Sequence, residues 1–293
     1  MEFGRLISAM VTPFNEQLQI NWNRTDELVD YLIEQQQNDG LVVAGTTGES
    51  PTLTDDEKLR LFDRVIAKVN GRAKVIAGTG SNDTAHSTHL SKEAAKLGVD
   101  GIMLVSPYYN RTSQDGLLRH FMTIAEEVSV PILIYNIPSR TGVNILPETM
   151  LKLAEHPNIV AVKESSGDLE QMSQIIAQAP SGFKLYSGDD NLTLPVLSIG
   201  GYGIVSVAAQ IVGVKMKRMI QAYLNGQVQI AAQLHAELTP IFKGMFFCPH
   251  RVPNPVPIKH ALKLKGVDCG TVRLPLIDVT ADESAFISNL LKQ

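Results

Sequence analysis

Short apolar runs rich in valine and isoleucine recur along the chain, and longer amphipathic stretches separate them. Such runs are typical of parallel strands that are buried on both faces, and the stretches between them are typical of helices that cover the strands. Eight runs are present, and they begin at Leu6, Gly40, Lys74, Asp100, Pro131, Ile159, Phe183 and Gly203. Consecutive runs start roughly 20 to 35 residues apart, which leaves room for one helix and two turns each time.

The amphipathic stretches carry the polar residues that favour helix starts. In TDDEKLRLFDRVIAKVNG, Thr54 and Glu57 have the spacing of a capping box, in which each side chain binds the backbone N–H near the other. Further helix starts are predicted at Asn82–Asp83, at Ser113–Asp115, at Pro147 and at Gly167–Asp168. Strand and helix signals therefore alternate over about the first 225 residues.

Eight strand and helix units between residue 6 and about residue 225 predict an α/β fold, a closed (β/α)8 TIM barrel, for which about 250 residues is a typical length. The alternative is an open doubly wound sheet, which usually carries GxGxxG after an early strand, and GTTGES at 45–50 does not match that motif. Beyond the barrel, three helical segments separated by proline-rich loops predict an extension. We therefore predict a barrel of residues 1–225 that carries the active site and a C-terminal helical extension of residues 226–293.

Composition and charge narrow the classes of partner. Of the 293 residues, 44% are hydrophobic and 19% are charged, which suits a protein with a large buried core. The formal net charge is −4, so a broad basic face is absent and no nucleic-acid partner is expected. No apolar run approaches the ~20 residues of a membrane span, so no membrane partner is expected.

The cysteines and the N-terminus favour a cytoplasmic location. Cys248 and Cys269 fit neither a disulfide framework nor a metal cluster, which is typical of a reducing compartment. The opening MEFGRLISAMVTPF passes directly into a strand pattern and lacks the basic leader and long apolar core of a signal peptide. We therefore expect no signal peptide.

No cofactor or metal is predicted, because P-loop and HExxH motifs are absent and the seven histidines are scattered. His86 and His89 share one helix face at i, i+3. Because no strand-end carboxylate follows nearby in the sequence, we predict that both are surface residues.

Polar or glycine-rich sequences follow most of the predicted strands. In a barrel, the C-terminal strand ends meet at one mouth, where active sites are built. Seven such endings are present: AGTTGES, AGTGSND, VSPYYNR, YNIPSRTG, VKESSGD, YSGDDN and VSVAAQ. Their hydroxyls and free loop amides would suit a small, oxygen-rich substrate with carboxylates.

Lys163 ends the apolar run IVAVK, which predicts a buried amine. Burial lowers the pKa of an amine, and a neutral amine attacks carbonyl groups. The alternative is a structural ion pair with Glu164 or with a more distant carboxylate. Glu164 is the next residue of the strand and should point to the opposite face, which favours a reactive lysine.

Three further strand-end groups are candidates for the same site. Tyr135 ends PILIY, and its hydroxyl could move protons near an amine, although it could equally be a packing group. Arg140, in the turn PSRTG, could clamp a carboxylate or remain a solvated surface residue. The pair Thr46–Thr47 could offer hydroxyls or could only cap the next helix.

Five motifs in this order resemble the class I pyruvate-dependent lyases and, among them, the dihydrodipicolinate synthase family: GTTGES at 45–50, PYYNR at 107–111, YNIPSRTG at 135–142, VKESSGD at 162–168 and SGDD at 187–190. The resemblance extends from Leu6 through the C-terminal helices. It implies that Lys163 forms a Schiff base with pyruvate, that the enamine attacks aspartate semialdehyde, and that cyclisation gives 4-hydroxy-tetrahydrodipicolinate, an intermediate of lysine and diaminopimelate synthesis.

The resemblance also implies roles for the other site residues. Tyr135 would relay protons with Thr46 and with Tyr109, which a neighbouring subunit would supply. The residues implied in substrate binding are Thr47, Arg140, Gly188 and Val205. The family's assembly implies a homotetramer built as a dimer of dimers, with no cofactor and no metal.

Two alternatives to the synthase remain open. An N-acetylneuraminate-type or 2-keto-3-deoxy sugar-acid aldolase would use the same lysine and tyrosine but should not need Arg140. A catalytically silent barrel that binds a small acid is disfavoured by the intact set of lysine, tyrosines and threonine.

Two features depart from the family pattern. At the lysine-binding cleft of lysine-inhibited relatives, this chain has Asp55, Lys58 and His86 in place of histidine and acidic residues. Positive charge there would repel the ammonium group of a lysine ligand, so weak or absent feedback inhibition is predicted. Three other positions of the cleft match: Ser50, Asn82 and Tyr108. The second departure is a longer segment, FFCPHRVPNPVPIKHA, which leaves the loop geometry there open.

Overall fold

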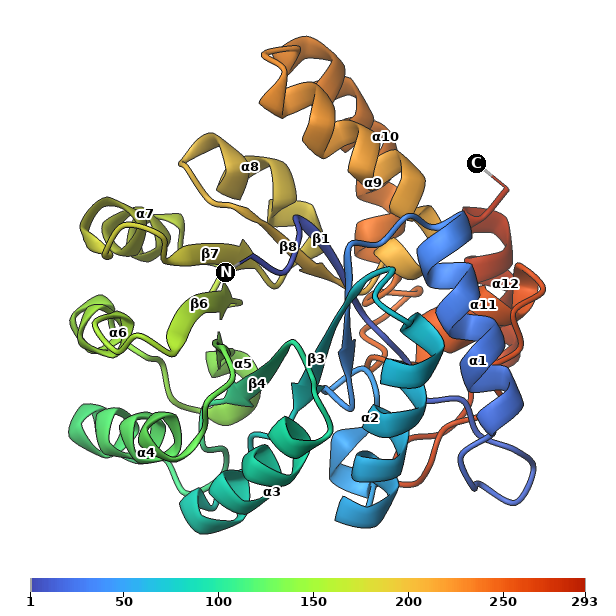
Figure 1. The fold of residues 1–293 in the computed structure, drawn as a ribbon. Helices are drawn as coiled ribbons and strands as arrows, with labels where there is room; N and C mark the ends of the chain where they lie inside the picture. The colour runs from blue at the N-terminus through green and yellow to red at the C-terminus, as the bar shows by residue number, and fades with distance from the viewer. Residues whose placement is uncertain (1, 293) are drawn as a thin grey trace.

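The computed structural model describes residues 2–292 and contains a closed barrel of eight parallel strands in the order β1 to β8 (Figure 1). The strands are β1 (Leu6–Ala9), β2 (Gly40–Val43), β3 (Lys74–Gly78), β4 (Gly101–Val105), β5 (Ile132–Asn136), β6 (Ile159–Glu164), β7 (Lys184–Ser187) and β8 (Gly203–Ser206). Each lies in one of the predicted apolar runs, and β6 extends one residue further, to Glu164. The barrel closes where Ile7 pairs with Val205. The predicted TIM barrel is confirmed.

Helices form a ring around the strands (Figure 1). They are α1 (Trp22–Asp30), η1 (Tyr31–Gln35), η2 (Ser50–Thr52), α2 (Asp55–Val69), α3 (Thr84–Lys96), α4 (Gln114–Glu127), α5 (Pro138–Thr141), α6 (Pro147–Ala154), α7 (Leu169–Gln178), η3 (Asp190–Leu192), α8 (Thr193–Ser198) and α9 (Ala209–Leu224). The capping box of Thr54 and Glu57 is present. Asp83, Ser113 and Asp168 cap α3, α4 and α7 by accepting backbone N–H groups, so these predicted helix starts are confirmed.

The barrel interior is filled by side chains, because alternate residues of each strand point inward. The buried cluster inside the barrel includes Ile7, Val42, Ile76, Leu133 and Val205, each no more than 1% exposed. The opposite faces of the strands pack against the helices. The interior is therefore a solid core, and any ligand must bind at its open end.

Three helices form the C-terminal part: α10 (Val228–Gly244), α11 (Val256–Leu264) and α12 (Ala281–Leu290). Helix α10 runs beside α9, and the two project from the ring in Figure 1. They share an apolar core in which Met216 and Met219 meet Leu234 and Leu238. The predicted helical extension is confirmed, whereas its division from the barrel at residue 225 stays a prediction.

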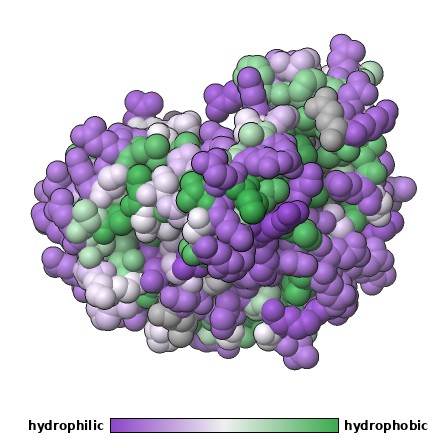
Figure 2. All heavy atoms as spheres, turned by 90° about the horizontal axis from the view of Figure 1, so that it is seen from above, coloured by the Kyte–Doolittle hydropathy of each residue, from purple (hydrophilic) through white to green (hydrophobic). Residues whose placement is uncertain are grey.

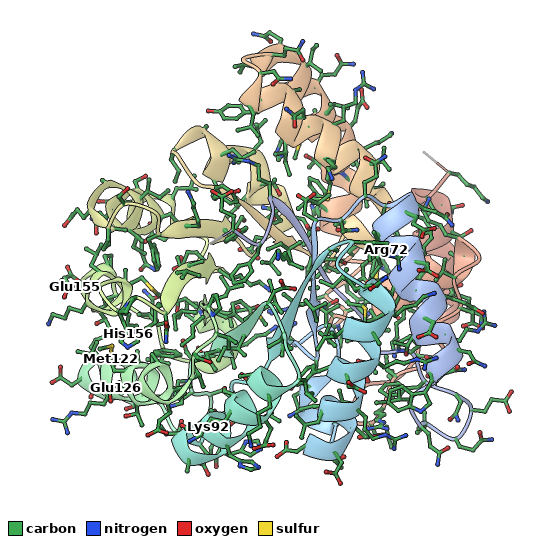
Figure 3. All side chains as sticks on the ribbon, in the orientation of Figure 1. Arg72, Lys92, Met122, Glu126, Glu155 and His156 are labelled. Carbon is green, nitrogen blue, oxygen red and sulfur yellow. The ribbon has the colours of Figure 1, made fainter. Side chains whose placement is uncertain are left out.

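Ion pairs connect neighbouring helices on the outside of the barrel. Arg72, shortly after α2, pairs with Asp30 and Glu34 of the α1–η1 segment, and Lys92 of α3 pairs with Glu127 of α4. Figure 3 labels Arg72 and Lys92 among the outer helices. Hydrophilic residues predominate on the face seen in Figure 2, and its apolar residues gather in several separate groups. No helix within residues 2–292 is long and apolar enough to cross a membrane.

Candidate active site

A cavity of about 200 Å³ lies at the C-terminal end of the barrel. The polar residues that line it come from the ends of β2, β4 and β5 and include Thr46, Ser50, Tyr108, Tyr135 and Arg140. Met103, Val105 and Ile137 add an apolar side to the cavity. Polar groups on an apolar wall are typical of a site for a small molecule.

Lys163 lies beside this cavity, in contact with the tyrosine that lines it. Strands β5 and β6 pair in a register that places Tyr135 opposite Lys163. The lysine is 6% exposed, and its Nζ lies 4.0 Å from the centroid of the Tyr135 ring. The register of two adjacent strands therefore brings the two predicted groups together.

The surroundings of Lys163 favour its neutral form. Burial lowers the pKa of the amine to about 8, and the charge of Arg140 acts in the same direction. The carboxyl groups of Asp189 and Asp190 act in the opposite direction. A pKa near 8 leaves an appreciable neutral fraction at neutral pH, which an amine nucleophile needs.

Glu164 is turned away from Lys163, as its place in the strand predicts. Its carboxylate is fully buried and accepts hydrogen bonds from Asn136 Nδ2 at 3.0 Å, Ser166 N at 2.8 Å and Gln171 Nε2 at 3.1 Å. Burial raises the pKa of Glu164. No ion pair with this neighbour holds Lys163 in its charged form.

Tyr135 is buried, and burial raises the pKa of its hydroxyl. The hydroxyls of Ser165 and Thr46 and the charge of Arg140 act in the opposite direction, which places all three groups near the phenol. A phenol between hydroxyls and beside an amine is arranged to pass protons.

Gly188 lies close to the lysine, and Val205 is one of the residues that fill the barrel interior. A Cβ atom at position 188 would lie 3.0 Å from Lys163 Cε, so glycine leaves the space that the lysine side chain occupies. Val205 belongs to the interior cluster that contains Tyr135. Gly188 therefore adjoins the predicted centre, whereas the role of Val205 stays a prediction.

Thr47 is held by the C-terminal segment. Its Oγ1 accepts a hydrogen bond of 2.8 Å from Asn254 Nδ2 in the longer segment after α10. Two residues beyond Thr47, Glu49 forms a buried ion pair of 2.7 Å with Lys259 of α11. The turn that carries Thr46 and Thr47 is thus fixed by the extension.

Arg140 and Tyr109 are exposed in the single chain. Arg140 lies in α5 and lines both the 200 Å³ cavity and a neighbouring cavity beside the C-terminal segment. Tyr109 is 91% exposed, has a φ of 76°, and does not line either cavity. The single chain therefore brings Lys163, Tyr135 and Thr46 together but not Tyr109.

Only one of the two helix histidines lies fully on the surface. His89 is exposed, whereas His86 is half-buried and its Nε2 lies 2.7 Å from Asp55 Oδ2. His86 was predicted to be a surface residue, and it is instead half-buried because the start of α2 brings Asp55 to it. Lys58 is buried beside the same carboxylate, at 3.8 Å.

Several groups around the centre carry no sequence signal that predicts a role for them. Ser165 and Asp189 lie in motifs that mark the site, yet no spacing distinguishes their side chains from those of their neighbours. Asn254 and Lys259 reach the site across more than 200 residues of sequence, as the separation of 207 between Asn254 and Thr47 illustrates. For Asn254 and Lys259, the signal in the sequence was the proline-containing segment NPVPIK, which they begin and end.

A closed barrel with a buried lysine and tyrosine at its C-terminal mouth is the arrangement of a (β/α)8-barrel lyase. The model of the dihydrodipicolinate synthetase family matches residues 2–293. The 4-hydroxy-tetrahydrodipicolinate synthase of Desulforamulus reducens is 54% identical over 292 residues, which cover 99% of this chain and 97% of that protein. The enzyme of the same name from Bacillus subtilis is 50% identical, with 100% of both chains covered.

Solved structures agree with this assignment. The crystal structure of a dihydrodipicolinate synthase from Bacillus anthracis has a TM-score of 0.97 and 44% sequence identity, and the match covers 100% of this chain and 99% of that one. The chain belongs to the dihydrodipicolinate synthetase family.

Proposed function

We propose that this chain condenses pyruvate with L-aspartate 4-semialdehyde to give 4-hydroxy-tetrahydrodipicolinate, the reaction for which its relatives are named. The observation that carries the proposal is the buried Lys163 amine, 4.0 Å from the Tyr135 ring at the barrel mouth. The family membership supports the choice of substrates. The reaction belongs to lysine and diaminopimelate synthesis, and we propose a cytoplasmic location for it.

The reaction starts with the neutral amine of Lys163. Nζ bonds to the C2 carbon of pyruvate, and the carbonyl oxygen takes up protons and leaves as water. The iminium that results withdraws electrons, so the methyl group gives up a proton and an enamine forms. Tyr135, with Thr46, is placed to deliver and to accept these protons.

Carbon–carbon bond formation follows. The enamine carbon attacks the aldehyde carbon of the semialdehyde, whose oxygen takes up a proton. The amino group of the same substrate then bonds to C2, the bond from C2 to Nζ breaks, and the closed ring leaves Lys163 free. The whole reaction uses the amine of Lys163, the proton relay of Tyr135 and Thr46, and substrate carboxylates that the site holds in place.

The substrate carboxylates need anchors that the site residues can provide. Thr46 and Thr47, with the free amides of their turn, suit the carboxylate of pyruvate. Arg140 presents a planar cation suited to the carboxylate of the semialdehyde. Gly188 adjoins the centre, and Gly188 and Val205 would contact the bound keto acid.

The neighbouring subunit completes the site in this proposal. Tyr109 is held in an uncommon backbone conformation and is 91% exposed, so it is available to enter a second copy of the chain. We propose a homotetramer formed by two such dimers. Sedimentation of the purified protein tests the assembly, and a monomer at full activity would exclude a role for Tyr109 in a partner's site.

Competing substrates provide the test of the proposed function. A coupled assay should show turnover with pyruvate and aspartate semialdehyde and little turnover with 2-keto-3-deoxy sugar acids or N-acetylneuraminate. The reverse preference would assign the chain to the aldolases that share the lysine and the tyrosine.

Arg140→Ala is expected to raise the KM for the semialdehyde about 10- to 100-fold, because a charged hydrogen bond to its carboxylate is lost. Formation of the pyruvate adduct should change little. Steady-state kinetics with each substrate varied in turn measure both effects. Arg119→Ala, an exposed arginine on α4, is the matched control. An unchanged KM for the semialdehyde would remove Arg140 from the site.

Adduct formation should depend on pH through Lys163. The amine attacks only when it has lost its proton, so the rate of adduct formation should rise with pH and reach half of its maximum near pH 8. Below that point the rate should fall about tenfold per pH unit, as the neutral fraction does. Rapid-quench kinetics between pH 6 and pH 10 test this, and a half-maximum above pH 10 would contradict an amine whose pKa burial lowers.

Lysine is expected to inhibit weakly or not at all. Lys58 lies beside Asp55 at the predicted cleft, so that carboxylate is already shared with a cation and with His86. A second ammonium group would meet positive charge there. Titration of the activity with L-lysine measures this, and inhibition below about 1 mM would contradict the electrostatic argument.

A further inference from the structure

The hydroxyl of Ser165 is buried at the centre of the site without a partner. Ser165 follows β6 directly and is 9% exposed. Its backbone N–H donates to Asn136 O at 2.9 Å, but its Oγ has no hydrogen-bond partner among residues 2–292. Most buried polar side-chain atoms have a partner in the folded protein. By contrast, Ser166 Oγ accepts a hydrogen bond from Asp168 N.

The unpartnered hydroxyl and the end of the Lys163 side chain face the same place. The Cβ position that any other residue would have at Gly188 lies 1.8 Å from Ser165 Oγ and 3.0 Å from Lys163 Cε. Any larger residue at 188 would therefore displace both groups. The Ser165 hydroxyl also lies near enough to the Tyr135 phenol to lower the pKa that burial of the phenol raises, although the two groups do not have the geometry of a hydrogen bond. The hydroxyl thus adjoins both the amine and the proton relay.

We propose that Ser165 is a further substrate-binding residue, whose hydroxyl donates a hydrogen bond to the carbonyl oxygen of the keto acid as Lys163 attacks it. The inference rests on the proposed function and adds a group to it. As the bond from Nζ to C2 forms, the C=O double bond becomes a single bond and negative charge develops on that oxygen. A preoriented donor stabilises such charge more than it stabilises the free substrate. No protein group among residues 2–292 satisfies this hydroxyl, which leaves it free to donate to a bound substrate.

Single-turnover formation of the pyruvate adduct tests this role. The adduct is trapped with borohydride at set times and measured by mass spectrometry of the intact protein. For Ser165→Ala, we expect the rate of adduct formation to fall about tenfold, because one hydrogen bond to the developing charge is lost. Cysteine has a similar shape and is a weaker donor, so the rate of adduct formation in Ser165→Cys should lie between those of the unaltered protein and Ser165→Ala. Ser166→Ala is the matched control and should react as the unaltered protein does.

Stability distinguishes this role from a structural one. Because Ser165 Oγ has no partner to lose, Ser165→Ala should leave the thermal unfolding midpoint unchanged or raise it. If the hydroxyl has a structural role, the thermal unfolding midpoint of Ser165→Ala will be lower than that of the unaltered protein. Adduct formation at the full rate in Ser165→Ala would also overturn the inference. If the unaltered protein itself gives no adduct, the proposed function fails first, and this inference fails with it. An adduct in the unaltered protein with equal rates in Ser165→Ala refutes only the role of Ser165.

Discussion

Lys163→Met is expected to lower the rate of condensation by about four orders of magnitude or more, because within residues 2–292 no other lysine lines or adjoins the cavity to form the imine. Methionine is unbranched and fills the same buried space without a charge. The variant should therefore fold as stably as the unaltered protein, or more stably, since a buried amine is costly to desolvate. Steady-state rates with both substrates, together with a thermal unfolding midpoint, measure the two effects.

The matched control for this variant is Lys152→Met, an exposed lysine on α6. That substitution should leave the rate within about a factor of two, because surface changes away from a site have small effects. A Lys163→Met protein that folds normally and retains a tenth of the activity would exclude Schiff-base chemistry at this residue.

Lys259→Met is expected to destabilise the protein by about 3–5 kcal/mol, because it leaves a buried carboxylate without its cation. The Lys259 side chain is 3% exposed and that of Glu49 is 1% exposed, and the ion pair between them is 2.7 Å long. Lys259 Nζ also donates to Thr271 O at 2.7 Å, and Arg273 N donates to the second oxygen of Glu49 at 2.8 Å. Urea denaturation followed by circular dichroism measures the change.

Two further variants separate the ion pair from simple packing. Lys263→Met, an exposed lysine on the same helix, should change stability by less than about 0.5 kcal/mol. Combining Lys259→Met with Glu49→Gln should recover part of the loss, because the uncompensated charge is removed. If Lys259→Met alone unfolds at the same urea concentration as the unaltered protein, the pair does not hold the extension to the barrel.

The ion pair also has a consequence for activity. Glu49 belongs to the turn GTTGES that carries Thr46 and Thr47, and Asn254 fixes Thr47 from the other side. The C-terminal part therefore positions the turn that we propose to bind the pyruvate carboxylate. Destabilising variants at Lys259 should raise the KM for pyruvate even where the protein remains folded.

The sequence predicts most of the barrel because its signals are local. Eight apolar runs mark the strands, and Thr54, Asp83, Ser113 and Asp168 start helices through contacts within three residues. Lys163 and Tyr135 were predictable as neighbours because both end strands that are adjacent in chain order. The rule that strand ends meet at one mouth needs no knowledge of distant contacts.

Groups that depend on distant contacts could not be predicted in this way. The pairing of Lys259 with Glu49, and of Asn254 with Thr47, follows from how the extension packs on the barrel. His86 finds Asp55 only because α2 and α3 lie side by side. Ser165 is only two residues from Lys163 in sequence, but only the space at Gly188 shows that its hydroxyl faces the end of the lysine side chain.

Peptide mapping of the borohydride-trapped protein tests the central claim most directly. After incubation with pyruvate and reduction, we expect one adduct per chain, on Lys163, and none in Lys163→Met. The absence of any adduct, or an adduct on another lysine with Lys163 unmodified, would contradict it.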